Sequence, residues 1–307
     1  MALPDDYLRY PERHYGMDHK RYDWSILDRR APVTWPGGAK LALWVVPMLE
    51  WFPLDMTNKP FAVPGGIARP HPDYWNYTLR DYGNRVGVFR LFKVLDGLGV
   101  KATVAMNAAL AERHPLLVSQ VIERDWELMA YGLDMGHLHY GGQDEAEEAA
   151  LVQQSVDILR AASGQPVTGW LSPARSESLA TPDLLAANGI RYVCDWANDE
   201  LPYAVHTTSD DIHAMPHAFE IDDQQIMVTL GQSETEYVQQ VKDQFDWLYK
   251  EAGERGGRVL SLGLHPWVSG QPYRIKAIAE ALGYIMGHDG VWSATGTEIL
   301  EAFTKQG

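Results

Sequence analysis

The stretch RVLSLGLHPWVSGQPYR, residues 258–274, begins as an apolar strand and ends in a polar corner. Its first part places aliphatic side chains among small residues, which is the pattern of a buried strand. The stretch then presents a single histidine, His265, followed at once by Pro266 and Trp267 and by a loop of glycine and proline. The position of an imidazole at this corner indicates that it meets other polar groups.

Similar apolar runs alternate with helical patterns along the whole chain. We predict strands at 39–48, 100–106, 126–132, 167–171, 190–196, 211–216, 225–230, 258–265 and 291–295. We predict helices at 84–99, 115–125, 144–164, 181–189, 233–253, 273–290 and 298–303. This alternation is typical of a parallel sheet covered by helices, and seven or eight such units favour a closed or nearly closed β/α barrel. The predicted catalytic barrel spans 33–307, and residues 1–32 are an extension expected to pack on it.

The composition of the 307 residues narrows the classes of function. The formal net charge of −15 disfavours nucleic acid and anionic membrane as partners, since both attract basic surfaces. Cys194 is the only cysteine, which leaves no intramolecular disulfide and no multi-cysteine zinc site. Neither GxGxxG nor GxxxxGK[ST] occurs, which disfavours nucleotide cofactors. No signal-peptide pattern and no run of roughly 18 apolar residues is present, so we expect a cytoplasmic protein.

Polar residues follow the predicted strands at their carboxyl ends, where β/α barrels place their chemistry. In chain order these residues are Glu50 and Trp51; Asn107; Tyr131, Asp134, His137 and His139; Ser172, Arg175 and Glu177; Asp195, Trp196, Asn198 and Asp199; Glu220, Asp222 and Asp223; and His265 with Trp267. The opposite ends of the strands carry ordinary residues such as Lys40, Lys101 and Arg258. This asymmetry indicates an enzyme whose groups converge on one pocket.

Simple structural explanations compete with a site role for several of these residues. A lone histidine at a strand end can be a satisfied core residue, and Glu50 can cap a neighbouring helix. The number of polar strand ends favours a site role for both His265 and Glu50. Asp195 is equally compatible with a site role and with binding a backbone amide.

The acidic cluster at 220–223 and the histidine pair at 137 and 139 are weaker candidates for site residues. We interpret the acidic cluster as a solvated turn, in which only Glu220 is kept as a substrate-binding candidate. His137 and His139 are two residues apart in a Gly-rich loop, a spacing found in metal sites, but an exposed loop is the favoured interpretation.

Several segments resemble the polysaccharide deacetylase superfamily, whose members share the NodB-type catalytic barrel. The matching segments are 80–104, 169–203, 245–253, 262–282 and 290–299. Within the superfamily they are most similar to the branch of metal-independent allantoinases and cyclic imide hydrolases. The resemblance runs from about residue 33 to the C-terminus and implies an α/β fold, a distorted (β/α)7–8 barrel.

The resemblance assigns roles to individual residues. The superfamily's first motif carries paired aspartates, and the matching PMLEW offers only Glu50. Its second motif carries metal-binding histidines, and Tyr131 stands at the first of these positions. The metal triad of one aspartate and two histidines is therefore not reproduced. Arg175 matches the arginine of the third motif, Asp195-Trp196 the Asp-Trp pair of the fourth, and His265 the general acid of the last.

We therefore predict a hydrolase that acts on a non-peptide C–N bond of a small linear or cyclic amide, imide or ureide, without a cofactor. Glu50 would activate water and His265 would protonate the leaving nitrogen. Asp195 would orient Arg175 or His265, and Tyr131 would donate a hydrogen bond to the reacting carbonyl. The remaining candidates, Trp51, Trp196, Trp267, Glu220 and Asn107, would bind the substrate.

Three alternatives stay open. The first is a zinc-dependent N-deacetylase that binds its metal through Asp134, His137 and His139. The second is a lyase or isomerase that uses Glu50 and His265 as an acid/base pair. The third is an inactive binding protein. The long excursion 52–83 is expected to shape the pocket or to contact a neighbouring chain, so a homo-oligomer is expected.

Overall fold

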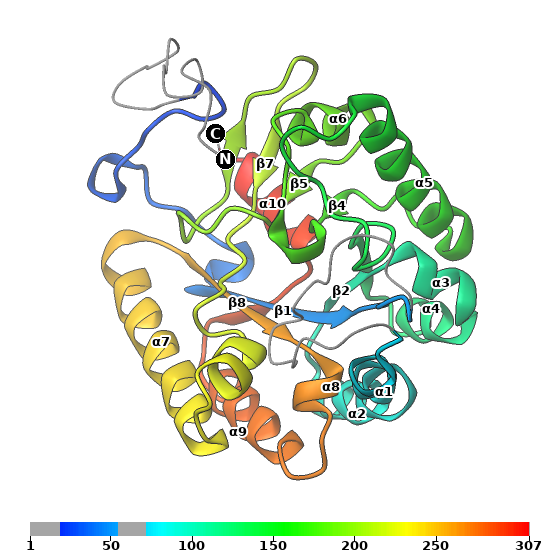
Figure 1. Ribbon diagram of the computed structural model, residues 1–307. Coiled ribbons are helices and arrows are strands. Elements are labelled where there is room, and N and C mark those ends of the chain that lie inside the picture. Colours follow the sequence, from blue (N-terminus) through cyan, green and yellow to red (C-terminus); the bar gives the residue numbers. More distant parts are fainter. Residues whose placement is uncertain (1–18, 55–71, 307) are drawn as a thin grey trace.

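The computed structural model describes residues 19–54 and 72–306, in which nine strands form one sheet (Figure 1). The strands are Leu41–Leu49 (β1), Thr103–Met106 (β2), Glu127–Ala130 (β3), Gly169–Trp170 (β4), Tyr192–Val193 (β5), Tyr203–Val205 (β6), Ile212–Ala214 (β7), Arg258–Leu264 (β8) and Val291–Ser293 (β9). Eight of them run in the order β6-β7-β5-β4-β3-β2-β1-β8, and β9 pairs with the first residues of β1. All pairs are parallel except β6 with β7.

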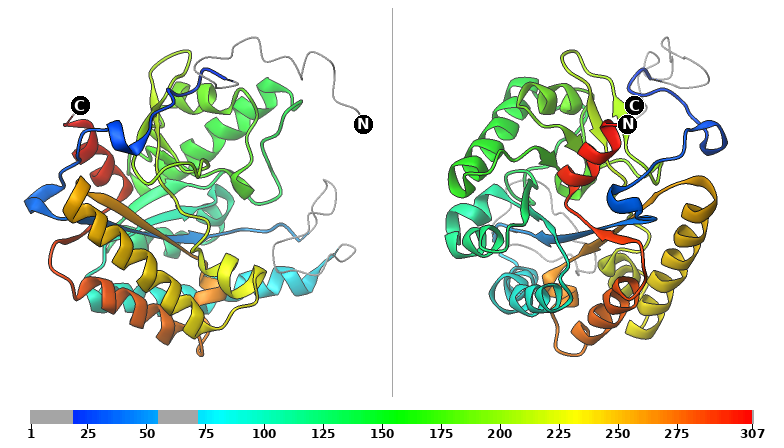
Figure 2. Two further views of the ribbon diagram at one scale, coloured as in Figure 1. Left: turned by 90° about the vertical axis from the view of Figure 1, so that its left-hand side faces the viewer. Right: turned by 180° about the vertical axis from the view of Figure 1, so that it is seen from behind.

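Helices surround the outside of the curved sheet, except that α10 packs against side chains of its inner face (Figures 1 and 2). They are Tyr74–Tyr82 (α1), Val88–Leu98 (α2), Ala108–Arg113 (α3), Pro115–Ile122 (α4), Glu145–Ser163 (α5), Thr181–Ala187 (α6), Glu234–Arg255 (α7), Pro266–Ser269 (α8), Ile275–Met286 (α9) and Gly296–Thr304 (α10). Local sequence fixes several ends: Ser233 and Glu236 form a capping box, and Gly99 and Gly164 end their helices in the left-handed conformation.

The barrel is open on one side. β8 pairs with β1 over seven residues, from Leu41–Arg258 to Pro47–Leu264, but β8 and β6 are the two ends of the strand order. The loops after β5 and β7 and the segment 25–30 line the resulting seam, the gap between β8 and the β5–β7 side of the sheet. The predicted distorted β/α barrel is confirmed.

Most predicted elements are present, but one predicted strand is wrong. Residues 225–230 form a π-helical turn, Gln225–Thr229, rather than a strand. The Asp222 carboxylate accepts the backbone N–H of Gln224 at 2.8 Å and so starts a helical turn, while Ile226 and Met227 are buried. β6, α3 and α8 were not predicted, because each is six residues or fewer and carries no clear periodicity.

The N-terminal extension is described only from residue 19. Arg21 forms an ion pair with Asp183 at 2.7 Å, and Arg30 forms one with Asp199 at 2.6 Å. These contacts tie residues 19–32 to the barrel, while the division at residue 33 stays a prediction. Residues 55–71 of the predicted excursion lie outside the described residues, and α1 occupies its last part. None of the helices in the described part of the chain is long and apolar enough to span a membrane.

Two glycines allow the chain after α1 to approach α8. A π-helical turn, Gly83–Gly87, joins α1 to α2 and packs against the Pro266–Trp267 corner. A Cβ on Gly83 would lie 2.6 Å from the backbone nitrogen of Trp267, and one on Gly87 would overlap the carbonyl oxygen of Pro266. The glycines of this turn therefore determine where the Pro-Trp corner sits.

Gly87→Ala should lower the free energy of unfolding by about 1–3 kcal/mol, because the added methyl group overpacks the contact with α8. Gly97→Ala in α2 is the matched control, since nothing lies within 4 Å of its added Cβ. The control should raise stability by about 0.5–1 kcal/mol through its effect on helix propensity. Urea denaturation measures both variants, and equal effects would contradict this packing.

Candidate active site

Four side chains meet where β1, β3 and β8 reach their carboxyl ends. Glu50 follows β1, Tyr131 follows β3, and His265 and Trp267 follow β8. Nε2 of His265 lies 3.8 Å from Oε1 of Glu50. Nε1 of Trp267 donates to Oε2 of Glu50 at 3.3 Å, and the Tyr131 hydroxyl lies 3.5 Å from Oε1. Sequence position alone predicted these four residues, and the structure brings them together around one buried carboxylate.

The other ring nitrogen of His265 faces two aspartates. Nδ1 lies 2.7 Å from Oδ1 of Asp223 and 3.3 Å from Oδ1 of Asp222. Asp223 also accepts the backbone N–H of His265 at 2.9 and 3.0 Å, and the hydroxyl of Ser269 donates to it. These bonds fix both the ring orientation and the backbone of the corner.

The charges around His265 favour its protonated form. Burial opposes the imidazolium, but Asp222, Asp223 and Glu50 outweigh burial and raise the pKa of His265 well above its usual value. Burial likewise opposes ionisation of Asp222, but the charge of His265 outweighs it and lowers the pKa of that carboxyl. At neutral pH, His265 is therefore a proton donor whose Nε2 points toward Glu50.

The interpretation of the acidic cluster at 220–223 is wrong. Asp222 and Asp223 are buried and pair with His265, whereas Glu220 is exposed. The two aspartates are thus residues of the candidate site that the sequence analysis assigned to a solvated turn. The sequence carries two adjacent aspartates, but their burial depends on β8 lying beside them, and nothing local indicates that contact.

Burial raises the pKa of Glu50, and the positive charges of His265 and Arg80 oppose this shift. Its backbone carbonyl accepts a hydrogen bond from the Asn84 side chain at 2.8 Å, which holds the end of β1. Glu50 is 6 % exposed. A buried carboxylate beside a buried imidazolium is a suitable pair for moving protons to and from one substrate.

The Asn107 side chain holds the backbone next to Glu50 and at Tyr131. Its amide group donates to the Tyr131 carbonyl, and its oxygen accepts the Trp51 backbone N–H at 2.6 Å. Both halves of the side chain are therefore engaged with backbone, so Asn107 fixes the ends of β1 and β3 rather than offering groups to a ligand.

Arg175 lies on a second side of the barrel interior. Its guanidinium contacts Nδ1 of His217 at 2.6 Å and donates to the carbonyl oxygens of Cys194 and His217, each at 3.1 Å. Burial and the charge of Arg175 lower the pKa of His217 well below its usual value, so His217 is neutral. Arg175 has a φ of +53°, and the preceding residue, Ala174, has a φ of +56°. Such strained backbone is typical of positions held for function.

Asp195 has partners other than those predicted. One carboxylate oxygen accepts the Ser172 backbone N–H at 2.7 Å, and the side chain lies close to the carboxyl of Glu177. Burial and Asp195 raise the pKa of Glu177 to about 9, so this pair holds one proton at neutral pH. His265 is oriented by Asp222 and Asp223 rather than by Asp195.

Among the three predicted tryptophans, only Trp267 hydrogen-bonds Glu50 in the described part of the chain. Trp51 packs edge-on against Tyr77, with ring centroids 5.6 Å apart. The Trp196 indole donates to Glu177 at 3.0 Å. Trp51 and Trp196 are half-buried next to Glu50 and Asp195 in the chain, so their place beside a substrate stays a prediction.

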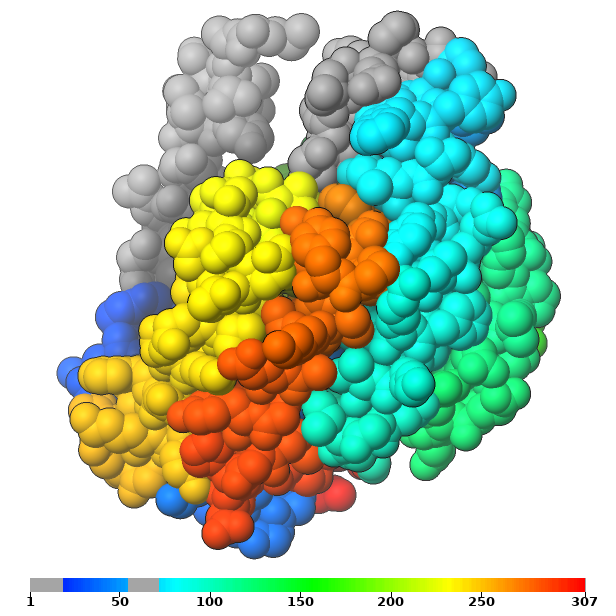
Figure 3. All heavy atoms as spheres, turned by 90° about the horizontal axis from the view of Figure 1, so that it is seen from below, coloured from blue at the N-terminus to red at the C-terminus, as the bar shows by residue number. Residues whose placement is uncertain are grey.

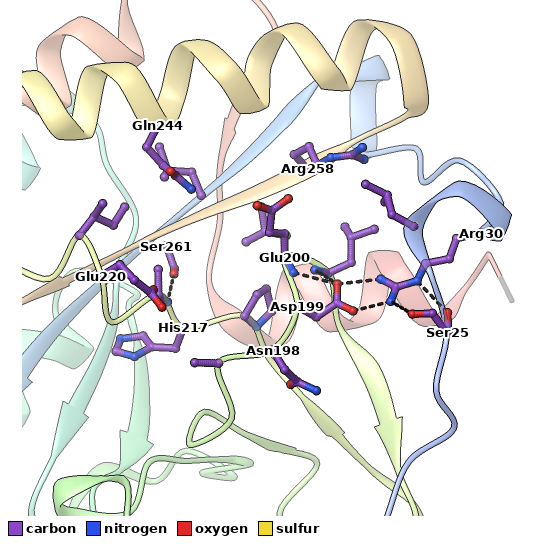
Figure 4. Close-up of a pocket in the computed structure, with 18 residues that line it drawn as sticks. Ser25, Arg30, Asn198, Asp199, Glu200, His217, Glu220, Gln244, Arg258 and Ser261 are labelled. Carbon is purple, nitrogen blue, oxygen red and sulfur yellow. Dashed lines mark hydrogen bonds and ion pairs between the residues drawn. The ribbon is translucent and has the colours of Figure 1, made fainter. Parts of the chain in front are cut away.

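Glu220 lines a cavity of about 640 Å³ in the seam, shown in Figure 4. The hydroxyl of Ser261 accepts a backbone N–H from the loop after β7, and Arg30 binds Asp199 on the opposite side (Figure 4). The lining of this cavity includes His217 but neither Glu50 nor His265. We place the chemistry at Glu50 and His265 because their buried, opposed charges meet there.

The residues around Glu50 do not fit a metal site of the superfamily type. Glu50 faces one imidazole nitrogen, a phenol and an indole N–H, and an indole N–H binds no metal. In the alternative site, His137 pairs with Asp134 at 2.8 Å while His139 faces Glu148 at 3.2 Å, so the three predicted ligands do not converge.

Within residues 19–54 and 72–306, Asp222, Asp223 and His265 form the one group of three potential ligand side chains. Asp223 already accepts the backbone N–H of His265 and the hydroxyl of Ser269. Its oxygens are therefore engaged in orienting the imidazole.

Comparison with known proteins agrees with this fold. Residues 72–193 match the family model for polysaccharide deacetylase. A peptidoglycan deacetylase of Helicobacter pylori is 23% identical over 73% of this chain and 86% of its own length. The crystal structure of PuuE allantoinase superposes with a TM-score of 0.80 at 26% identity, covering 88% of this chain and 92% of the other. A probable polysaccharide deacetylase from Pseudomonas aeruginosa PAO1 also gives a TM-score of 0.80, at 27% identity, covering 89% and 93%.

Residues 72–193 are therefore similar to a polysaccharide deacetylase domain, and the chain shares the NodB-type barrel of these structures. These similarities agree with the hydrolase of non-peptide carbon–nitrogen bonds that the resemblance in the sequence implies.

Proposed function

We propose that this protein hydrolyses a small cyclic imide or ureide without a metal, with Glu50 and His265 as its base and acid. One observation carries the proposal: a buried carboxylate and a buried imidazolium face each other across 3.8 Å at the carboxyl ends of the strands. The likeness to an allantoinase structure supports a ureide or a related ring as the substrate class.

The first step adds water to the carbonyl carbon. Glu50 takes a proton from the water as its oxygen bonds to that carbon, and the carbonyl oxygen becomes an oxyanion. The Tyr131 hydroxyl, which lies beside Glu50 in the resting protein, turns to donate to the oxyanion. Burial raises the pKa of Tyr131 well above its usual value, so the hydroxyl keeps its proton.

The second step breaks the C–N bond. Nε2 of His265 gives its proton to the leaving nitrogen, while Nδ1 stays bonded to Asp223. The proton held by Glu50 then returns to His265, so the cycle consumes one water and leaves both residues unchanged. Trp267 excludes bulk water from Glu50 and offers a flat wall to a planar ring.

A hydrolysis screen tests this proposal. Small cyclic imides, ureides and N-acyl amides are incubated with the protein in water labelled with heavy oxygen. We expect ring opening with one labelled oxygen in the product acid. Turnover without the label would indicate a lyase or isomerase and contradict the hydrolysis. The homo-oligomer expected from residues 52–83 stays a prediction that sedimentation of the same sample tests.

Tyr131→Phe should lower kcat about 100-fold, because the phenol that stabilises the oxyanion is lost. Tyr192→Phe is the control, since its hydroxyl is buried at the opposite ends of the strands, where it donates to Glu127 at 2.8 Å. The control should leave kcat unchanged, although it removes a buried hydrogen bond. Steady-state kinetics on the best substrate decides, and an unchanged kcat for Tyr131→Phe would remove this role.

A further inference from the structure

Arg80 of α1 is a buried cation close to the proposed site. It is 3 % exposed, and its guanidinium carbon lies 4.5 Å from the centre of the Trp267 ring and 5.1 Å from that of Phe52. One guanidinium nitrogen donates to the Asn76 side chain at 3.1 Å. The cation therefore lies over an aromatic face, an arrangement that is strongest when water is excluded.

The same indole joins Arg80 to Glu50. The face of Trp267 contacts the guanidinium, while its Nε1 donates to Glu50 at 3.3 Å. A positive charge over the ring draws electron density from the indole and makes its N–H a stronger donor. Gly83 allows this geometry, since any side chain there would displace the Trp267 backbone. Figure 3 shows the segment of α1 and α2 packed directly against the segment of α8.

We propose that Arg80 is a positioning residue, which keeps Glu50 ionised and aligned by acting through the Trp267 indole. This role rests on the proposed function of Glu50 as the base. Arg80 gives the site a fixed positive charge that needs no bound ion. A lysine could not replace it fully, because only the planar guanidinium stacks on the ring while also bonding Asn76.

The electrostatics of Glu50 agree with this role. Burial raises the pKa of Glu50, and the charge of Asp222 adds to this increase. The charge of His265 lowers the pKa, followed by the charge of Arg80 and the hydrogen bond from Trp267. Tyr131 also faces Glu50 and is neutral. Removing the charge of Arg80 should therefore raise the pKa of Glu50. As the pH falls, Glu50 should then become protonated at a higher pH than in the unmodified protein.

The test follows the Trp267 indole N–H by nitrogen–proton NMR across a pH titration, with the resonance assigned from Trp267→Phe. In the unmodified protein we expect a titration that disappears in Glu50→Gln. In Arg80→Met the resonance should shift and its midpoint should move to higher pH. The midpoint for Arg80→Lys should lie between those of the unmodified protein and Arg80→Met. Arg80→Lys therefore provides the test if Arg80→Met does not fold. Arg85→Met, whose side chain is 74% exposed, is the control and should match the unmodified protein.

Activity provides the second measurement. On the substrate found by the screen, Arg80→Met should lower kcat/KM about tenfold on the acid side of the pH profile and less at higher pH. A folded Arg80→Met with an unchanged indole titration and an unchanged acid limb would overturn the proposal. Full activity in Glu50→Gln would instead refute the proposed base, and the indole titration would still report whether Arg80 acts on Glu50.

Discussion

His265→Asn should lower kcat/KM about 1,000-fold at neutral pH, which is within the range expected for loss of a general acid. Asparagine can still donate to Asp223, but it offers no proton to the leaving nitrogen. Steady-state kinetics on the substrate found by the screen measures the loss. His206→Asn is the matched control, because that imidazole is half-exposed and pairs only with surface aspartates.

The same substitution should also change how stability depends on pH. The pKa of His265 is raised in the folded protein, so its ion pairs with Asp222 and Asp223 stabilise the fold fully below about pH 6.5. This contribution is lost as the pH rises through the raised pKa. The difference in unfolding free energy between the unmodified protein and His265→Asn should therefore be largest in acid and shrink in alkali. A difference that grows with pH would mean that His265 is buried in its neutral form.

Glu50→Gln should abolish turnover almost completely, with a loss of about 1,000-fold or more in kcat. The amide keeps the shape of the carboxyl and can still accept the Trp267 N–H, but it cannot take a proton from water. Because burial disfavours the charged form of Glu50, the variant should be at least as stable as the unmodified protein in thermal unfolding.

Glu280→Gln is the control for this substitution. Glu280 is exposed on α9, where it pairs with Lys242 at 2.9 Å. It should retain full activity. A Glu50→Gln variant with comparable activity would exclude Glu50 as the base and would direct attention to Asp195, a buried carboxyl that follows β5.

The sequence predicted the parts of the site that depend on strand ends. Glu50, Tyr131 and His265 each follow a recognisable apolar run, and parallel strands bring their carboxyl ends to one face. Asp222 and Asp223 lie between β7 and a π-helical turn, where no strand end marks them. Their pairing with His265 depends on the loop crossing the open seam, a contact between residues 42 apart in the chain.

Two further features could not be predicted from the apolar pattern of the chain. The apolar run 225–230 has the composition of a strand, but a carboxylate before it starts a helical turn. The glycines at 83 and 87 are visible in the sequence, yet only the folded chain shows that they make room for Pro266 and Trp267. Local patterns thus predicted the elements, while the contacts that orient the imidazole and the indole depend on how those elements meet.

We propose that the protein hydrolyses a C–N bond without a metal, with Glu50 as the base and His265 as the acid. The most direct measurement is the kcat/KM of protein treated with a strong chelator, on its best cyclic imide or ureide, together with the metal content of the same sample. We expect unchanged kcat/KM in metal-free protein and loss of activity in Glu50→Gln. Stoichiometric zinc, with activity lost on chelation and restored by zinc, would contradict it.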